Sequence, residues 1–413
     1  MSVADEKKVL SVFCLTYNHV NYIKRTIESF LVQNTSFEFD IFIFDDASND
    51  GTSEIIRHYT QMYPKKIKSY ISEKNTYRDK NRTEILNQLF DLYLDGKYVA
   101  WCEGDDYWID KNKLQKQVEF LENNPECVMV AHAHKIWDSV NKTWSVKKIK
   151  EKNGYLTNEE VILQPQGNLA TASLVMKRDV FLMQGGFPRC DVLDFPMQLN
   201  AISKGRIYYM SDIMSVYRYM HLGSWTFNYV KNEKMFLSHS LGFIEFLKKY
   251  NLYTKRNFEQ LIYRKIKLYI SDVIEFYYIK HKYIEINAQY KNINLINEMN
   301  KVLRWLFGDF DRSVLENVHK IYLYGNGHYS KILQKSILEK GFQIDGFIVS
   351  KKIDKNDDNV ITVSDVENLE DFFCMIAISQ QSEEEIMVKL EQNKITNYIA
   401  PLWIKREVIL GEE

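Results

Sequence analysis

Short apolar runs alternate with helical patterns through the first hundred residues, and this alternation limits the folds open to the chain. The apolar runs are rich in β-branched and aromatic residues, as buried strands are, and they cover residues 9–15, 39–44, 67–71 and 98–102. Between them, apolar residues recur at helical spacing in residues 22–31, 53–63 and 82–94. Strands that alternate with helices form a parallel sheet with two covered faces. The sequence therefore predicts an α/β fold, in which ligands lie beyond the carboxyl ends of the strands.

Polar residues follow three of these runs, at Thr16–Asn18, Asp45–Asp46 and Asp105–Asp106. Adjacent carboxylates disfavour each other's ionisation, so burying them together is costly. The cost falls where a divalent cation binds between a carboxylate and a phosphate, as Mg²⁺ does in proteins. Because the three groups belong to one edge of the predicted sheet, we expect a nucleotide-type site there. The alternative for Asp105–Asp106 is a solvated turn with a helix-capping aspartate.

Each polar group has a chemical role to offer such a site. Tyr17 can stack on a flat base, and Asp46 can accept a charge-assisted hydrogen bond from a base N–H. Asp105 can accept from a ribose hydroxyl, and Asp106 can hold the metal. The alternatives are core packing for Tyr17, and for Asp45 either a helix cap or hydrogen bonds within its own turn.

The order of these motifs resembles the nucleotide-diphosphate-sugar half of family-two glycosyltransferases, closest to bacterial enzymes that build capsule, exopolysaccharide or glycoprotein glycans. The segments that carry the resemblance are residues 15–18, 44–52, 102–108 and 110–121, and it extends over residues 9–228. It implies a GT-A fold, a nucleotide-sugar donor, Mn²⁺ or Mg²⁺ as cofactor and inversion at the anomeric carbon. UDP is the expected nucleotide because Tyr17 and Asp46 match family members that bind uracil.

The resemblance also implies which residues contact the donor. The base lies against the main chain of Leu15 and the side chains of Tyr17 and Asp46, with Arg82 reaching the base or a phosphate. The resemblance also implies that Asp105 contacts the ribose and that Asp106 binds the metal.

Residues 215–226 resemble the closing loop of the family, in which many members carry a histidine two residues after an arginine. That position is Met220 in this chain, and His221 comes one residue later. Two outcomes stay open: His221 is a metal ligand, or the metal is held by Asp106, the diphosphate and water alone.

The general base is expected at Asp194, within an acid–aromatic–proline–apolar run that resembles the family. An inverting displacement needs one base on the face opposite the leaving group, and such a base contributes typically about 10²–10⁴-fold. Asp191 is the second candidate. Asp194 also suits the N-cap of the helix that Pro196 begins.

Residues 137–154 are rich in lysine, which is typical of a solvated loop or β-ribbon, with a phosphate-bearing acceptor as the alternative. The predicted domains are a GT-A domain at 1–228, a helical region at 229–316 and a small Rossmann-like α/β domain at 317–413. The helices suit a linker bundle, a homo-oligomer contact or a peripheral membrane face near a lipid-linked acceptor. Gly325-Asn326-Gly327 begins a dinucleotide fingerprint, with Asp345 near the position of a ribose-binding acid.

The charge and cysteine pattern bounds the environment of the chain. A net charge of −1 supplies no field for nucleic acid, and five scattered cysteines indicate reduced thiols. With no apolar signal core and no run of about 18 apolar residues, we expect a cytoplasmic protein, at most peripheral on the inner face of the membrane.

These observations predict an inverting, metal-dependent glycosyltransferase that uses a UDP-sugar and a glycan, glycolipid or glycoprotein acceptor. One alternative is a nucleotidyl- or phosphoryl-transferase, although the N-terminal half has no phosphate-cradling Gly-Lys motif. Another is a non-catalytic nucleotide-sugar-binding partner of a second transferase.

Overall fold

The computed structural model describes residues 8–269, apart from residues 78, 80, 166, 167, 189 and 191, and short stretches of the C-terminal part. Those stretches are residues 320–325, 330, 334, 338, 341, 343–349, 360–362, 372–376 and 398–399. The chain divides into two compact units, residues 1–242 and 243–413. The predicted boundaries at 228 and 316 remain predictions, and most of the predicted helical region lies outside the described residues.

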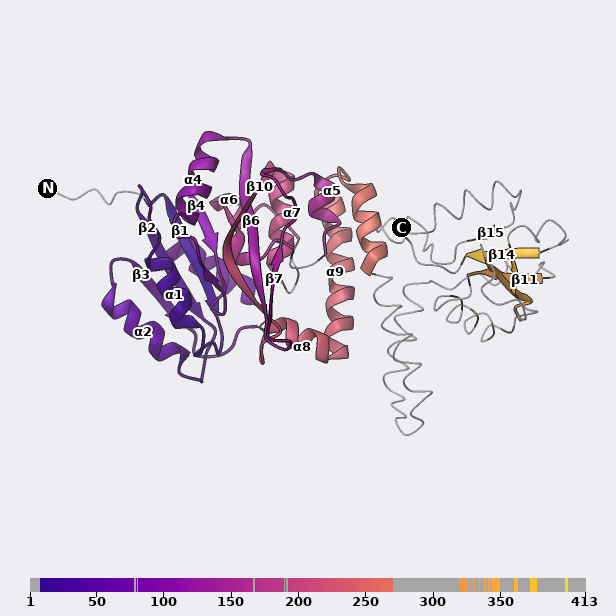
Figure 1. Cartoon of the computed structure of the whole chain (residues 1–413), viewed down its shortest axis with the longest axis horizontal. Coiled ribbons are helices and arrows are strands. Elements are labelled where there is room, and N and C mark those ends of the chain that lie inside the picture. The colour runs from indigo at the N-terminus through magenta and orange to yellow at the C-terminus, as the bar shows by residue number, and fades with distance from the viewer. Residues whose placement is uncertain are drawn as a thin grey trace. The chain divides into compact units, whose positions relative to one another are not determined.

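The first unit is built on a ten-stranded mixed sheet (Figure 1) in which the main path runs β3-β2-β1-β4-β9-β6-β10-β5. The strands are β1 (Leu10–Thr16), β2 (Phe39–Asp45), β3 (Ile67–Ile71), β4 (Tyr98–Trp101), β5 (Tyr107–Trp108), β6 (Cys127–Asp138), β7 (Thr143–Lys147), β8 (Gly154–Tyr155), β9 (Val175–Lys177) and β10 (Arg206–Tyr219). The four predicted strands are β1 to β4, and they pair in parallel, so the predicted α/β fold is confirmed.

Helices alternate with these strands or follow them. They are α1 (Ile23–Leu31), α2 (Thr52–Met62), α3 (Arg82–Tyr93), α4 (Lys113–Asn123), α5 (Asn158–Ile162), α6 (Arg178–Phe181), α7 (Asp194–Lys204), α8 (Trp225–Lys231) and α9 (Glu233–Tyr253), with a short 3₁₀ turn at Thr171–Ser173. Helix α9 extends across the boundary between the two units. None of the helices in the described part of the chain combines the length and apolarity needed to cross a bilayer.

Two hydrophobic cores lie on the two faces of the sheet because successive strand residues point in opposite directions. On one face the ring of Phe13 lies between 4.9 and 6.2 Å from four other aromatic rings, Phe42, Phe90, Trp101 and Phe181. On the other face its neighbours Val12 and Cys14 pack with apolar residues of α1 and α2. Each fully buried side chain of this size contributes about 1.5–3 kcal/mol. The near-continuous apolar pattern of β1 is thus explained by burial on both sides.

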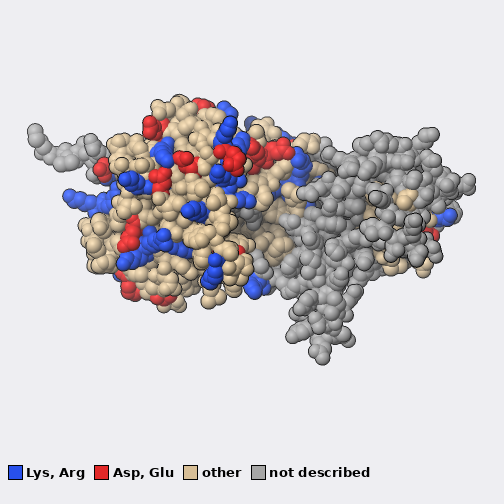
Figure 2. Space-filling view, in the orientation of Figure 1, with Lys and Arg blue, Asp and Glu red and all other residues tan. Residues whose placement is uncertain are grey.

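Charged side chains are interspersed over the first unit on the face that Figure 2 shows, as expected for a chain of net charge −1.

The second unit contains a parallel five-stranded sheet of order β13-β12-β11-β14-β15. Its strands are β11 (Lys320–Tyr324), β12 (Gly346–Val349), β13 (Val360–Thr362), β14 (Phe372–Ile376) and β15 (Tyr398–Ile399). Gly325 follows β11 with a φ of 100°, which favours glycine. Asp345 lies just before β12, at the end of the sheet where the strands begin, and its carboxylate accepts a hydrogen bond from the Ile321 N–H at 2.7 Å. The ribose-binding position suggested for Asp345 is therefore wrong, and the Rossmann-like assignment remains a prediction.

Candidate active site

The three predicted polar groups meet at one edge of the sheet. β1 ends at Thr16, β2 at Asp45 and β4 at Trp101, and hydrogen bonds join the loops that follow. The Asp46 N–H donates to the Thr16 carbonyl at 3.0 Å, and the Gly104 N–H donates to the Leu15 carbonyl at 2.8 Å. Gly104 packs so closely against Thr16 that a Cβ at this position would collide with its side chain. A glycine is therefore needed for the acidic loop to lie beside β1.

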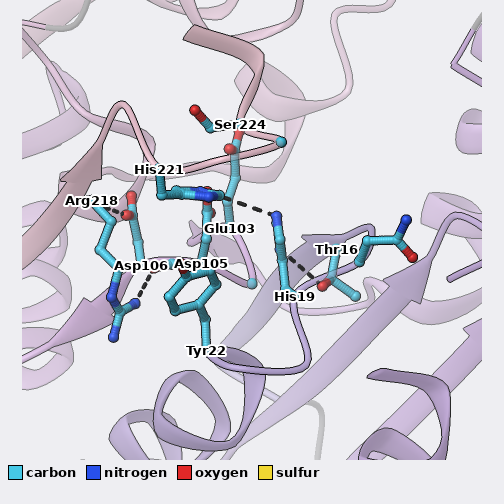
Figure 3. A network of polar contacts seen from close by, with 12 residues as sticks. Thr16, His19, Tyr22, Glu103, Asp105, Asp106, Arg218, His221 and Ser224 are labelled. Carbon is cyan, nitrogen blue, oxygen red and sulfur yellow. Dashed lines mark hydrogen bonds and ion pairs between the residues drawn. The ribbon is translucent and has the colours of Figure 1, made fainter. Parts of the chain in front are cut away.

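Asp105 lies between two imidazoles that arrive from distant parts of the chain (Figure 3). Its Oδ2 is 2.7 Å from Nε2 of His221 and 3.8 Å from Nε2 of His19. The ligand atoms of these three residues all lie within 4.8 Å of one another. Burial alone would raise the pKa of Asp105, but the charge of His19 and the hydrogen bond with His221 lower it to about 2. The carboxylate is therefore ionised at neutral pH.

This cluster, His19–Asp105–His221, fits a divalent metal. Imidazole nitrogens and a carboxylate oxygen are ligands for Mn²⁺ and its first-row neighbours. The second carboxylate oxygen of Asp105, Oδ1, is buried and has no hydrogen-bond partner among the described residues. An unsatisfied buried acceptor of this kind costs about 1–3 kcal/mol, more when charged, and a bound cation would remove that cost.

His221 reaches Asp105 because of the backbone at the residue before it. β10 ends at Tyr219, and Met220 takes a φ of 59°, in the left-handed region that non-glycine residues rarely adopt. The next side chain, His221, is only 3% exposed and points to the acidic loop. The structure thus brings His221 to the acidic pair although it follows the family position by one residue. Its role as a metal ligand remains a prediction.

Asp106 faces a different partner from Asp105. Its Oδ1 accepts from the main-chain N–H of Arg218 at 2.8 Å, and its carbonyl accepts from the Thr26 hydroxyl at 2.6 Å. Burial, followed by the charge of Asp105, raises the pKa of Asp106 well above its usual range. The carboxyl group of Asp106 therefore fastens the acidic loop to β10, and it is not part of the histidine cluster. The predicted assignments, metal for Asp106 and ribose for Asp105, remain predictions, and Asp105 is the member of the pair that lies with the two histidines.

Arg218 supplies positive charge beside the acidic loop. Its Nη1 donates to the Asp105 carbonyl, and its guanidinium lies 4.9 Å from the Tyr22 ring centroid and 4.6 Å from that of Tyr107. Stacking on two aromatic rings fixes the orientation of a guanidinium. The charge is thus held near both Asp105 and Asp106.

The residues predicted to contact the base lie on the same edge. The ring of Tyr17 is 44% exposed, so a planar ligand has access to it. Asp46 is buried, and its Oδ1 accepts from the Thr76 N–H at 2.6 Å. Asp45 accepts from the Ser48 N–H and from the hydroxyls of Ser48 and Ser53, so it holds its own turn, as its alternative reading expected.

Glu103 lies in the acidic loop, and charged residues of α7 and α3 influence its pKa. Burial raises its pKa to about 8, and the charges of Asp105 and Asp194 add to the rise, whereas Arg82 opposes it. Asp194 and Arg82 are thus close enough to influence the charge of Glu103, and their predicted roles in the site remain predictions.

Asp194 is the first residue of α7 rather than its cap. Leu193 is the N-cap residue, and no side chain caps this helix, so the N-cap role suggested for Asp194 is wrong. Burial raises the pKa of Asp194 above its usual range. A carboxylate with a raised pKa is a stronger general base near neutral pH. The second candidate, Asp191, lies outside the described residues.

Two residues of the site, His19 and Glu103, had no assigned role in the sequence. The signal for His19 was its position in the loop after the first strand, at the edge that also carries the acidic pair. Glu103 stands two residues before Asp105 in the same loop, so its side chain was a candidate for the same site.

We expect Glu103→Gln to stabilise the metal-free protein at alkaline pH. The unfolded chain loses the Glu103 proton near pH 4.5, whereas the folded chain keeps it until about pH 8. Folding stability therefore falls as the pH rises between these values, and glutamine removes this fall. At about 1.4 kcal/mol for each unit of pKa difference, the gain is roughly 1–4 kcal/mol.

The measurement is urea unfolding of both proteins in EDTA between pH 4 and pH 9. The two proteins should differ least at pH 4 and most above pH 8. Parallel pH dependence of the two curves would contradict a raised pKa for Glu103.

The chain is similar in sequence to known glycosyltransferases. Residues 11–182 match the family model described as Glycosyl transferase family 2. The uncharacterized protein Rv1520 of Mycobacterium tuberculosis is 36% identical over 123 residues, which are 30% of this chain and 34% of that protein. WfaP of Escherichia coli, named a UDP-Glc:alpha-D-GlcNAc-diphosphoundecaprenol beta-1,3-glucosyltransferase, is 27% identical over 229 residues, 54% of this chain and 82% of its own.

A solved structure, S. aureus TarS 1–349 in complex with UDP-GlcNAc, aligns with 65% of this chain and 73% of its own. The sequence identity is 19% and the TM-score is 0.47. The chain spans about a third of the length of the mycobacterial relatives that it matches.

Proposed function

Because residues 11–182 form a family 2 glycosyltransferase domain, we propose that the chain transfers a sugar from a nucleotide-diphosphate donor with inversion at the anomeric carbon. The family match confirms the resemblance to family-two glycosyltransferases over residues 11–182. The observation that carries the proposal is the His19–Asp105–His221 cluster at the edge where β1, β2 and β4 end.

The donor is proposed to bind along this edge as a UDP-sugar. Tyr17 offers an exposed ring for the base. The Oδ2 atom of Asp46, which accepts no hydrogen bond from the described residues, and the main chain near Leu15 offer acceptors for base N–H groups. Arg82 carries a positive charge whose field reaches Glu103, and a positive charge at this edge is complementary to a phosphate. The relative WfaP is named for the donor UDP-Glc, which supports the choice of UDP.

The proposed metal ligands are Asp105, His19 and His221, with Mn²⁺ preferred over Mg²⁺. A set with two imidazoles suits Mn²⁺ better than Mg²⁺, which binds oxygen ligands and water. When bound, the metal supplies Lewis-acid stabilisation of the leaving diphosphate. Asp106 positions the acidic loop through its hydrogen bond to Arg218.

Asp194 is the proposed general base. Its carboxylate takes the proton from the acceptor hydroxyl as that oxygen bonds to the anomeric carbon, and the donor diphosphate departs from the opposite face. Its raised pKa and its electrostatic proximity to Glu103 support this role.

The acceptor is proposed to be a glycan, glycolipid or glycoprotein glycan, used in the cytoplasm or at the inner face of the membrane. The relative WfaP is named for a lipid-diphosphate-linked sugar acceptor, which supports the glycolipid choice.

The test is turnover of a panel of UDP- and GDP-sugars by the full chain with Mn²⁺, Mg²⁺ or EDTA. We expect release of UDP from one UDP-sugar, fastest with Mn²⁺ and absent in EDTA. Binding of UDP without turnover of any donor, even with acceptor glycans added, would favour a non-catalytic nucleotide-sugar-binding partner. Release of pyrophosphate or phosphate in place of UDP would favour a nucleotidyl- or phosphoryl-transferase.

A further inference from the structure

A cavity of about 450 Å³ opens beside the candidate active site, between α1, β5 and the β6–β7 ribbon. Ligand sites in proteins are concave, largely apolar and about this size. Three of its lining residues are large exposed hydrophobics: Trp144 is 56%, Val146 48% and Ile109 44% exposed. Exposed apolar side chains gathered around one hollow indicate a binding site rather than chance exposure.

The charged residues that line this cavity are both positive. Arg25 and Lys135 line it, and none of its lining residues is acidic. Neither cation has an ion pair with an acidic side chain among the residues that the structure describes. Arg25 is held in place because its guanidinium lies 3.8 Å from the ring centroid of Tyr107. Two cations with no acidic partner are complementary to an anionic ligand.

Trp144 supplies a flat apolar wall. It lies opposite Trp137 across the β6–β7 pair, and the two ring centroids are 4.9 Å apart. The aliphatic face of a pyranose ring packs well on an indole held in this way, because the face of the indole carries negative charge density and sugar C–H groups are weakly positive.

Tyr107 connects the cavity to the candidate active site. Its ring lies under Arg25 on the cavity side and near Arg218, whose main-chain N–H binds Asp106. Tyr107 also follows Asp106 directly in the chain. A ligand in the cavity therefore lies next to the acidic loop, where part of an acceptor glycan belongs.

We propose that this cavity binds an acidic sugar residue of the acceptor, with the sugar ring on Trp144 and its carboxylate or phosphate paired with Arg25 and Lys135. Identifying the bound sugar as part of the acceptor rests on the proposed function. The binding of an acidic sugar in the cavity does not depend on transfer. It specifies the acceptor class as an anionic glycan.

The test is binding to the full chain by isothermal titration, with a hyaluronan tetrasaccharide as the acidic probe and chitotetraose as its neutral counterpart. We expect the acidic probe to bind at least about 10-fold more tightly, because one hydrogen bond to a charged group is worth about 1.5–3 kcal/mol. Trp144→Ala and Arg25→Gln should each weaken the acidic probe about 10-fold. Lys24→Gln is the matched control, since it removes the same charge from the neighbouring exposed position of α1 outside the cavity.

Equal affinity for the two probes, no binding of the acidic probe, or equal loss in the Lys24→Gln control would overturn the inference. The same is true if Trp144→Ala and Arg25→Gln abolish binding to phosphatidylglycerol vesicles and leave the saccharide affinity unchanged, because the surface would then be a membrane contact. UDP binding with Mn²⁺ is measured separately on the wild-type chain. Its absence would contradict the proposed function without changing the saccharide result.

Discussion

Asp105→Asn is expected to weaken Mn²⁺ binding by at least about 100-fold and to reduce sugar transfer by about 10³-fold. The asparagine keeps the shape of the side chain but removes the only carboxylate of the cluster His19–Asp105–His221. Loss of a residue that merely supports a metal ligand already costs 10–100-fold in affinity, and loss of a charge-stabilising group costs about 10²–10³-fold in rate. Mn²⁺ affinity is measured by electron paramagnetic resonance of free Mn²⁺, and transfer by UDP release.

Asp106→Asn separates the two possible assignments of the acidic pair. Its carboxyl group binds the Arg218 N–H, and its raised pKa favours the neutral form. The amide is close in shape to that form, so we expect Mn²⁺ affinity within a few-fold of the wild type. Asp95→Asn, an exposed change before β4, is the control for loss of a charge. Should Asp106→Asn lose the metal while Asp105→Asn keeps it, the assignment drawn from the family resemblance is right and the one favoured by geometry is wrong.

Asp194→Asn is expected to lower kcat by about 10²–10⁴-fold without changing the affinity for UDP or Mn²⁺. The base acts only in the transition state, so its removal leaves donor binding intact. In the wild type, kcat should rise with pH as the carboxyl group, whose pKa burial raises, loses its proton. This rising limb should be absent from the variant. The measurement is kcat between pH 5 and pH 9 together with UDP titration at pH 7.

Asp191→Asn is the companion experiment, since Asp191 was the second candidate for the base. A normal rate in Asp194→Asn with a large loss in Asp191→Asn would transfer the role. Loss of UDP binding in Asp194→Asn would mean that Asp194 belongs to the donor site.

Much of the first unit could be predicted from local patterns. The runs that became β1 to β4 are apolar enough to be recognised individually, and their parallel order follows from the helices between them. Since parallel strands end at the same edge, the sequence alone assigns Tyr17, Asp46 and Asp105 to one site. A strand near Val175 and Met176 is indicated by their apolar pattern, but its antiparallel pairing between β4 and β6 was not predictable, because three residues carry too little pattern to fix a partner.

The roles within the acidic pair depend on contacts that no local pattern reveals. The Thr26 hydroxyl donates to the carbonyls of both Gly104 and Asp106, and these bonds help set which carboxylate turns to β10. The histidine partners of Asp105 come from positions 19 and 221, and the second depends on the left-handed backbone of Met220. The directions of the Asp105 and Asp106 side chains thus depend on contacts with segments far away in the sequence. They can be read only from the three-dimensional structure.

The distance in sequence between His19 and His221 has a consequence for biosynthesis. A nascent chain that has emerged only as far as residue 182, where the family match ends, already contains His19 and Asp105 but lacks β10. Without β10 it has neither the Arg218 amide that holds Asp106 nor the second imidazole. The complete cluster can therefore form only after more than two hundred residues have been made, and a fragment that ends at residue 182 lacks its third member.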